Sequence, residues 1–514
     1  MSGESGARPG WVYLVGAGPG DPELITLRGA ELLQTAEVVL HDELLDPAVL
    51  DLAPQAERRS VGKRGHLPSD RSKKQQAIND ELVALAKAGR SVVRLKGGDP
   101  FLFGRGAEEA LALRAAGLPF EIVPGVSSPL GATAYAGIPL THRELASSVT
   151  MVTAVKQDGE GFDWSELACV KGTLCVFMGA RHLEAISLAL VSEGGRAPDT
   201  PAAVIEWISY PRQRSVAGRL DAIASLAAEA GLGTPSLLVV GDVVRLRESL
   251  GWFEAQPLFG KRVLVTRPAH QIAPTAALLR RRGAEPVPFP TIALQPADPA
   301  PVAEAVAQLD DYDLVAFTSR NGVDYFWEAI EAAGRDARAF GRCRLAAIGP
   351  ATAEGLTAHG LRADLVAETF VAEHLASAVL AALPPGARVL LPRAEVAREV
   401  LPEMLRDAGM TVDVVPVYQT VTAEPTTSLR ELVADIDVIT LTSSSTVDKL
   451  VELVGDGAAE ALAGIVLASI GPITTRTAER HGLTVAVTAT VSTGPGLIEA
   501  LEAHYRESGG FSAA

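Results

Sequence analysis

Three segments in the second half of the chain recur further along it in the same order. The segment VLVTRP at residues 263–268 is echoed by VLLPR at 389–393, FTSRNGV at 317–323 by LTSSSTV at 441–447, and LAAIGPAT at 345–352 by LASIGPIT at 467–474. Each follows an apolar, strand-like run and precedes a helix-like run. Self-similarity that preserves order indicates two copies of one α/β unit, so two similar open parallel sheets are predicted. Their strand-end loops, rich in Ser, Thr, Gly and Arg, suit a polyanionic ligand.

Two glycine-rich loops dominate the first half. GAGPG at residues 16–20 lies between a predicted strand at 11–15 and a predicted amphipathic helix at 23–34, and GGDP at 97–100 follows an apolar run at 91–93. A second helix is predicted over 107–116. Glycines at a strand end remove side chains where a ligand must approach the main chain closely. Asp99 then places a carboxylate at the mouth of the gap.

The first glycine loop admits a dinucleotide-binding alternative. Asp42 lies about twenty residues beyond the glycines, as the dinucleotide fingerprint requires. Against this, Asp21 occupies the third glycine position and would place a carboxylate where a pyrophosphate should lie. The position of Asp42 thus keeps one alternative open, a nicotinamide oxidoreductase fused to a ligand-sensing binding module, and Asp21 counts against it.

Composition narrows the classes of partner. The formal net charge of −16 over 514 residues argues against a general nucleic-acid or anionic-membrane binder, so an anionic ligand must meet a local basic pocket. Three cysteines lack metal-ligand spacing and predict neither a zinc site nor a disulfide framework. Residues 1–10 lack the features of a signal peptide, and no apolar run has the length of a membrane span. These features predict a cytoplasmic protein.

Several motifs of the first half occur in the order of one known family. They are GAGPG at 16–20, LITLRG at 24–29, GGDP at 97–100, FGRG at 103–106, PGVSS at 124–128 and GIPLTHR at 137–143. Over residues 11–244 the chain resembles the tetrapyrrole methylases, and uroporphyrinogen-III C-methyltransferase in particular. The resemblance implies a two-lobed α/β enzyme that uses S-adenosylmethionine, releases S-adenosylhomocysteine and needs no metal.

The resemblance also implies site residues. The cofactor positions carried over are Pro19, Gly97, Gly98, Asp99, Leu102, Ser127, Ser128, Met178 and Trp207, the last where the family often has a glycine. Asp42 is the candidate proton acceptor and Lys63 the candidate proton donor, and their structural alternatives are a capping carboxylate and a surface lysine. Thr141, His142 and Arg143 are candidate substrate contacts. The reaction would transfer two methyl groups to uroporphyrinogen III and give precorrin-2.

The second half, residues 260–505, resembles uroporphyrinogen-III synthase, which closes hydroxymethylbilane to uroporphyrinogen III with inversion of the terminal ring. Tyr418 matches an interlobe tyrosine of that family and is the candidate acid, or else only packs. Thr318, Ser319, Ser443 and Thr474 are candidate carboxylate anchors, and Arg267, Arg320 and Arg393 candidate counter-charges.

The predicted organisation follows from these resemblances. A leader at 1–10 precedes a methyltransferase domain at 11–249 with lobes at 11–144 and 145–249, and a linker covers 250–260. A synthase domain follows at 261–505, with one lobe from 261–291 plus 426–505, the other from 293–419, and a tail at 506–514. The expected enzyme is bifunctional, acts in sirohaem or cobalamin biosynthesis and dimerises through its methyltransferase half. A methylase with a non-catalytic synthase-like half is the remaining alternative.

Overall fold

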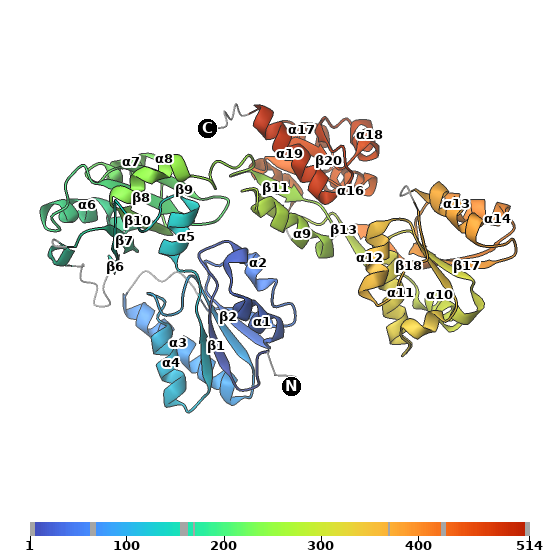
Figure 1. Ribbon diagram of the computed structural model, residues 1–514, viewed down its shortest axis with the longest axis horizontal. Helices are drawn as coiled ribbons and strands as arrows, with labels where there is room; N and C mark the ends of the chain where they lie inside the picture. Colours follow the sequence, from blue (N-terminus) through green and yellow to red (C-terminus); the bar gives the residue numbers. More distant parts are fainter. Residues whose placement is uncertain are drawn as a thin grey trace. The chain divides into compact units, whose positions relative to one another are not determined.

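The computed structural model of the chain describes residues 6–61, 68–154, 163–167, 170–367, 371–422 and 428–508 (Figure 1). It divides into two compact units, one of Met1–Val263, Ala276–Pro286 and Ile498–Ala514, the other of Leu264–Thr275 and Val287–Leu497. Two five-stranded sheets lie in the first unit, and two further sheets belong mainly to the second. Among the described residues, no helix combines the length and apolar character needed to cross a membrane.

The first sheet is wholly parallel and covered on both faces. Its order is β3 (Glu57–Ser60), β2 (Val38–His41), β4 (Val92–Lys96), β1 (Val12–Gly16), β5 (Phe120–Val123). Helices α1 (Leu27–Thr35) and α2 (Pro47–Leu50) cover one face, and α3 (Pro68–Lys87) and α4 (Gly106–Ala115) the other, as Figure 1 shows. Strands buried on both faces are normally apolar throughout, and Arg94 and Lys96 on β4 depart from that rule.

The second sheet is mixed. Its order is β6 (Val149–Thr153), β7 (Thr173–Phe177), β10 (Ser236–Val240), β8 (Pro201–Glu206), β9 (Arg214–Arg219). Only β6 and β7 are parallel, and the other neighbours are antiparallel. Helices α6 (Leu183–Ser192) and α7 (Ile223–Glu229) pack on one face and α5 (Ser128–Tyr135) on the other. The edge strand β9 was not predicted from the sequence.

The helix predicted over 23–34 begins later than expected. A short 3-10 turn, Pro22–Leu24, comes first, and α1 starts at Leu27. The extended backbone of Ile25 ends this turn, and Thr26 then caps α1, because its hydroxyl accepts a hydrogen bond of 3.1 Å from the Gly29 N–H.

The sheets of the second half confirm the predicted duplication. The third has the order β12 (Glu285–Pro288), β11 (Arg262–Val265), β19 (Val438–Leu441), β20 (Val466–Ser469), β21 (Val485–Thr488). The fourth runs β13 (Ile292–Pro296), β18 (Thr411–Thr422), β17 (Arg388–Ala394), β14 (Leu314–Phe317), β15 (Arg344–Ala347), β16 (Leu365–Val366). The order β11-β19-β20-β21 in the third sheet repeats the order β17-β14-β15-β16 in the fourth. The echoed sequence segments lie in or directly after strands that occupy equivalent places in these two orders.

The helices repeat in the same way. After β14 and β19 come α11 (Arg320–Ala332) and α16 (Ser444–Val454), and after β15 and β20 come α12 (Pro350–Ala358) and α18 (Pro472–Arg480). The remaining helices are α8 (Arg247–Leu250), α9 (Ala269–Arg280), α10 (Pro299–Ala307), α13 (Ala372–Ala382), α14 (Val400–Asp407), α15 (Leu429–Leu432), α17 (Ala458–Ala461) and α19 (Gly494–Ser508). The strands of the third sheet thus come from the first and last segments of the second half. Strands β13 to β18, which lie between them in the sequence, form the fourth sheet.

Candidate active site

The two glycine-rich loops of the first half meet backbone to backbone. The Gly98 N–H donates to the Gly18 carbonyl at 2.8 Å, and the Gly18 N–H donates back to the Gly98 carbonyl at 3.3 Å. A third loop joins them after β5, where a Cβ on Gly125 would lie 2.3 Å from the Gly98 carbonyl oxygen. The ends of β1, β4 and β5 therefore approach so closely that no side chain fits between them.

A cavity of about 530 Å³ opens beside this junction. Five of the nine predicted cofactor residues line it: Pro19, Gly97, Gly98, Ser128 and Trp207. Its wall also includes Ile208, Tyr210 and Pro235, in loops next to strands of the second sheet. Asp42 and Arg105, in loops next to the first sheet, are among the other lining residues. A cleft between two α/β layers at the carboxyl ends of parallel strands is where such folds bind ligands.

Bulky residues in left-handed backbone conformations line this cavity. Phe103, Arg105 and Trp207 have φ of 53°, 59° and 49°. The Trp207 ring is held from one side by the Arg212 guanidinium, 3.8 Å from the ring centroid. Non-glycine residues adopt this conformation only when their surroundings impose it, and such residues concentrate at functional sites.

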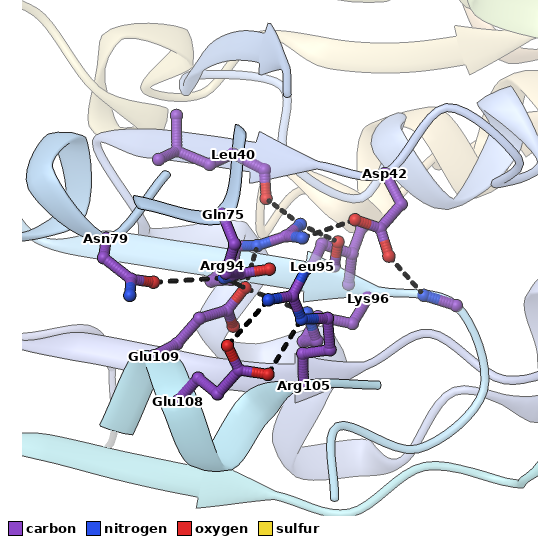
Figure 2. Close-up of polar contacts among 11 residues, drawn as sticks. Leu40, Asp42, Gln75, Asn79, Arg94, Leu95, Lys96, Arg105, Glu108 and Glu109 are labelled. Atoms are coloured by element: carbon purple, nitrogen blue, oxygen red, sulfur yellow. Dashed lines mark hydrogen bonds and ion pairs between the residues drawn. The ribbon is translucent and has the colours of Figure 1, made fainter. Parts of the chain in front are cut away.

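Asp42 follows β2 and has both carboxylate oxygens engaged, as Figure 2 shows. Oδ1 accepts from Arg94 Nη2 at 2.5 Å, and Oδ2 accepts from the Gly97 N–H at 3.2 Å. Burial opposes ionisation of the carboxyl, but the charges of Arg94 and Lys96 outweigh it and hold the pKa of Asp42 below its ordinary value. The side chain stays 37% exposed at the cavity wall, so a carboxylate faces whatever the cavity binds.

Behind Asp42 lies a buried polar cluster that the sequence analysis did not find. Glu109 of α4, fully buried, accepts from Arg94 Nε at 3.2 Å and from Lys96 Nζ at 3.0 Å (Figure 2). Gln75 of α3 donates to the same Glu109 oxygen at 3.2 Å and to the Asn79 side-chain oxygen at 3.0 Å. The available signal was the pattern Arg-Leu-Lys in an otherwise apolar strand, which puts two cations on one buried face.

Arg105 is a second charged group at the cavity that was not predicted as a site residue. Glu108, one turn into α4, accepts from Arg105 Nε at 2.8 Å and from Nη2 at 2.7 Å. These hydrogen bonds raise the pKa of Arg105 and lower the pKa of Glu108. These two hydrogen bonds hold the Arg105 guanidinium in a fixed position at the cavity, where a cation is a suitable partner for a substrate carboxylate.

The carboxylate of Asp99 is used within the fold. Its Oδ1 accepts from the Phe101 N–H at 2.8 Å and its Oδ2 from the Gly125 N–H at 3.1 Å. Asp99 thus ties the second and third loops together, and it does not line the cavity. Leu102, Ser127 and Met178 are not among the lining residues either, and Met178 is 53% exposed with φ of 57°.

The candidate substrate contacts of the first half lie apart from the cavity lining. Thr141, His142 and Arg143 belong to a turn in which the His142 N–H donates to the Ala146 carbonyl at 2.9 Å. Thr141 and Arg143 are exposed and available to a ligand. Lys63 falls outside the described residues.

Asp21, which counted against a dinucleotide site, is also committed to the fold. Its Oδ1 accepts from the Glu23 N–H at 2.9 Å and caps the 3-10 turn, while its Oδ2 accepts from the Tyr135 hydroxyl at 2.6 Å. A carboxylate fixed here repels a pyrophosphate, which agrees with the sequence argument. No group of side chains suited to a metal ion occurs among the described residues.

In the second half, Tyr418 lies on β18 and is buried. Its hydroxyl is 3.2 Å from the Ser319 Oγ, and its ring stacks on Tyr325 with centroids 5.4 Å apart. Ser319 also accepts from the Gly322 N–H and so caps α11. Two residues predicted to act on one substrate are therefore in contact.

The duplicated counterpart has the same construction. Ser443 caps α16 by accepting from the Thr446 N–H at 3.2 Å, as Ser319 caps α11. Thr318 precedes Ser319 and is half-buried, while Thr474 is buried within α18. Burial lowers the pKa of Arg267, whose Nε has no hydrogen-bond partner among the described residues.

Comparison with known proteins supplies the family. Residues 11–224 match the family described as tetrapyrrole (corrin/porphyrin) methylases, and residues 273–499 match uroporphyrinogen-III synthase HemD. A porphyrin biosynthesis protein HemD of Ruminiclostridium josui is 35% identical over 481 residues, which cover 92% of this chain and 94% of that protein. The chain belongs to this family of methylase–synthase fusions. Its fold class is the predicted one, a two-lobed methylase fold followed by a duplicated synthase fold.

Other relatives of the fusion match one half each. A siroheme synthase of Tolumonas auensis is 50% identical over 259 residues, and the match spans 50% of this chain and 54% of that protein. A uroporphyrin-III C-methyltransferase of Thermus thermophilus, solved with S-adenosyl homocysteine, is 44% identical over 46% of this chain and 99% of its own, with a TM-score of 0.40. A mutant uroporphyrinogen III synthase of the same species is 20% identical over 48% and 99%, with a TM-score of 0.38.

Proposed function

We propose that the fusion closes hydroxymethylbilane to uroporphyrinogen III in its synthase half and methylates that product twice in its methylase half, giving precorrin-2. The cavity at the junction of the two glycine loops is the observation that carries the methylase assignment. It is lined by glycine backbone, by aromatic side chains and by charged side chains of both signs, which suits S-adenosylmethionine beside an acidic macrocycle. The protein would be cytoplasmic and dimeric through the methylase half, with the domain boundaries predicted from the sequence.

The residues at the cavity have distinct proposed roles. When bound, S-adenosylmethionine supplies an electrophilic methyl group. Gly97 and Gly98 leave room for it against the backbone, and Trp207 closes the opposite wall. Asp42 faces the reacting region as an ionised carboxylate. Because its pKa is lowered, it stabilises positive charge on the pyrrole that attacks the methyl group better than it stores the proton that is later shed. Arg105, held at the cavity wall by Glu108, is assigned to contact a substrate carboxylate.

In the synthase half, Tyr418 and Ser319 form the proposed acid site. Loss of the hydroxyl group of hydroxymethylbilane needs a proton, and the Tyr418 hydroxyl beside Ser319 can deliver one. The duplicated cap residues Ser319 and Ser443, with Thr318 and Thr474, would hold carboxylates of the open tetrapyrrole through hydroxyl groups and loop amides.

Tyr418→Phe is expected to slow ring closure at least about tenfold, because a positioned acid contributes roughly that or more. Unfolding free energy should change by only about 1 kcal/mol, the worth of one hydrogen bond. The rate is measured by stopping the reaction at set times and quantifying the uroporphyrinogen III formed. Tyr325→Phe, which removes the hydroxyl of the stacked neighbour, is the matched control and should stay near the wild-type rate. Equal rates for wild type and Tyr418→Phe would reject Tyr418 as the acid.

The proposed pair of activities is tested by one reaction. The purified chain, given hydroxymethylbilane and S-adenosylmethionine, is expected to yield a tetrapyrrole two methyl groups heavier than uroporphyrinogen III, detected by mass spectrometry. Authentic uroporphyrinogen III replaces the first substrate in a parallel reaction. Methylation of that compound without turnover of hydroxymethylbilane would favour the alternative of a non-catalytic synthase half, and absence of methylation in both reactions would contradict the proposal.

A further inference from the structure

The interior of the first sheet contains an unusual concentration of charge. Arg94, Lys96 and Glu109 are 2%, 3% and 0% exposed, and Asp42 is in contact with Arg94. Charged groups are costly to bury unless opposite charges accompany them. Here two cations face two carboxylates, so the four groups balance only as a complete set.

Glu109 is the centre of this set. Its Oε1 accepts from Arg94, Lys96 and Gln75, while its Oε2 is buried and has no partner among the described residues (Figure 2). Arg94 extends from Glu109 at one edge of its guanidinium to Asp42 at the other. The only link between Glu109 and the cavity carboxylate that is drawn in Figure 2 is therefore Arg94.

Resting on the methyl transfer proposed above, we infer that Lys96 and Glu109 form a charge-compensating pair that positions Asp42 through Arg94. Both are assigned as positioning residues: Glu109 is fully buried and does not line the cavity, and Lys96, which contributes to the cavity wall, is only 3% exposed. Glu109 fixes the position of the Arg94 guanidinium, which donates a hydrogen bond to Asp42. Lys96 compensates the negative charge of Glu109. Removal of either member leaves one buried charge unbalanced, whereas removal of both restores the balance.

Within the described part of the chain, the pair is faced by groups from β4, α3 and α4 and by Asp42. Arg94 shares its strand, Asp42 lies after β2, Glu108 and Arg105 lie at the start of α4, and α3 contributes the uncharged Gln75. Burial lowers the pKa of Lys96, Arg94 adds to this, and Glu109 and Asp42 oppose it. Loss of Glu109 therefore lowers the pKa of Lys96 further.

Opposite pH dependences follow for the two single variants. In Glu109→Gln, Lys96 binds its proton less readily in the folded than in the unfolded state, so stability relative to wild type should rise with pH. Lys96→Met removes a lysine whose pKa is lowered in the folded state, and with it the stability that wild type gains as pH rises, so stability relative to wild type should fall with pH. We expect the Tm deficits at pH 5 and pH 9 to differ by at least about 3 °C, in opposite directions for the two variants.

The double variant tests the compensation directly. Glu109→Gln with Lys96→Met should show a smaller Tm deficit than either single change and little pH dependence, because Arg94 and Asp42 remain as a neutral pair. Methyl transfer should fall about tenfold in each single variant and recover at least threefold in the double variant, a non-additive pattern that independent packing defects do not produce. In Glu109→Gln, where the changed residue does not line the cavity, affinity for S-adenosylhomocysteine should stay within about threefold of wild type.

Glu502→Gln is the matched control, since Glu502 is a buried carboxylate of α19 paired with Arg282 and Arg506. It should leave methyl transfer unchanged. Additive Tm deficits without opposite pH slopes would overturn the inference, as would wild-type methyl transfer in both single variants. A wild-type chain without methyl transfer would instead contradict the proposed function, while the Tm measurements would still decide the charge compensation. If one single variant does not fold, the double variant and the other single change retain the test.

Discussion

Gly125→Ala is expected to lower the unfolding free energy of the first unit by about 3 kcal/mol, the upper range for forcing a methyl group into packed structure. The added Cβ would lie 2.3 Å from the Gly98 carbonyl oxygen and 2.7 Å from the Gly16 Cα. These are backbone atoms of two adjoining strand ends, so they cannot move aside as a flexible side chain could. The loop junction would open, and S-adenosylhomocysteine binding, measured by calorimetry, should be lost.

Gly97→Ala is the matched control for that result. A Cβ at Gly97 would meet only the Leu45 Cδ2, at 3.7 Å, an ordinary contact distance. Because Gly97 lines the cavity, this methyl group should weaken S-adenosylhomocysteine binding while Tm stays near the wild-type value. If Gly125→Ala unfolds at the same temperature as Gly97→Ala, the close approach of the three loops does not stabilise the fold.

Asp42→Asn is expected to reduce methyl transfer by at least about 100-fold, the range associated with loss of one group that stabilises charge in the transition state. The amide has nearly the same shape and can still accept from the Gly97 N–H, but it carries no charge to face the reacting pyrrole. It also leaves Arg94 with one carboxylate partner in place of two. Single-turnover rates at saturating S-adenosylmethionine separate this loss from any change in affinity.

Asp51→Asn is the control for the change of charge. Asp51 lies at the end of α2, where its 69% exposed side chain is 3.5 Å from an Arg58 nitrogen, and a surface pair of this kind contributes little. Its variant should transfer methyl groups at the wild-type rate. A fall of less than threefold in Asp42→Asn would show that Asp42 serves only to anchor Gly97.

Much of the architecture could be predicted because it rests on local pattern. The order of the echoed segments determined the duplicated sheets, and the two glycine loops met because both follow neighbouring strands of one parallel sheet. Edge strand β9 was missed because its residues, RSVAGR, lack a clear alternation of apolar and polar side chains.

The buried interior of the site could not be predicted in the same way. Asp99 was predicted as a cofactor contact. In the structure the backbone N–H groups of Phe101 and Gly125 donate to its two carboxylate oxygens, and these hydrogen-bond partners could not be identified from the sequence. Arg94 and Glu109 lie on different elements, so their pairing depends on how α4 packs on β4. The resemblance to a family indicated which loops matter but not which charges lie behind them.

Among the described residues, non-glycine backbones with positive φ occur only in the methylase half. They include Ser209, which holds the first glycine loop by accepting from the Asp21 N–H at 2.9 Å. Selection of variants for heat tolerance alone would favour glycine at such positions, since relief of the strained conformation is worth about 1 kcal/mol or more. The same exchanges would erase the contacts that shape the cavity, so improved endurance and catalytic competence should prove hard to obtain together in this half.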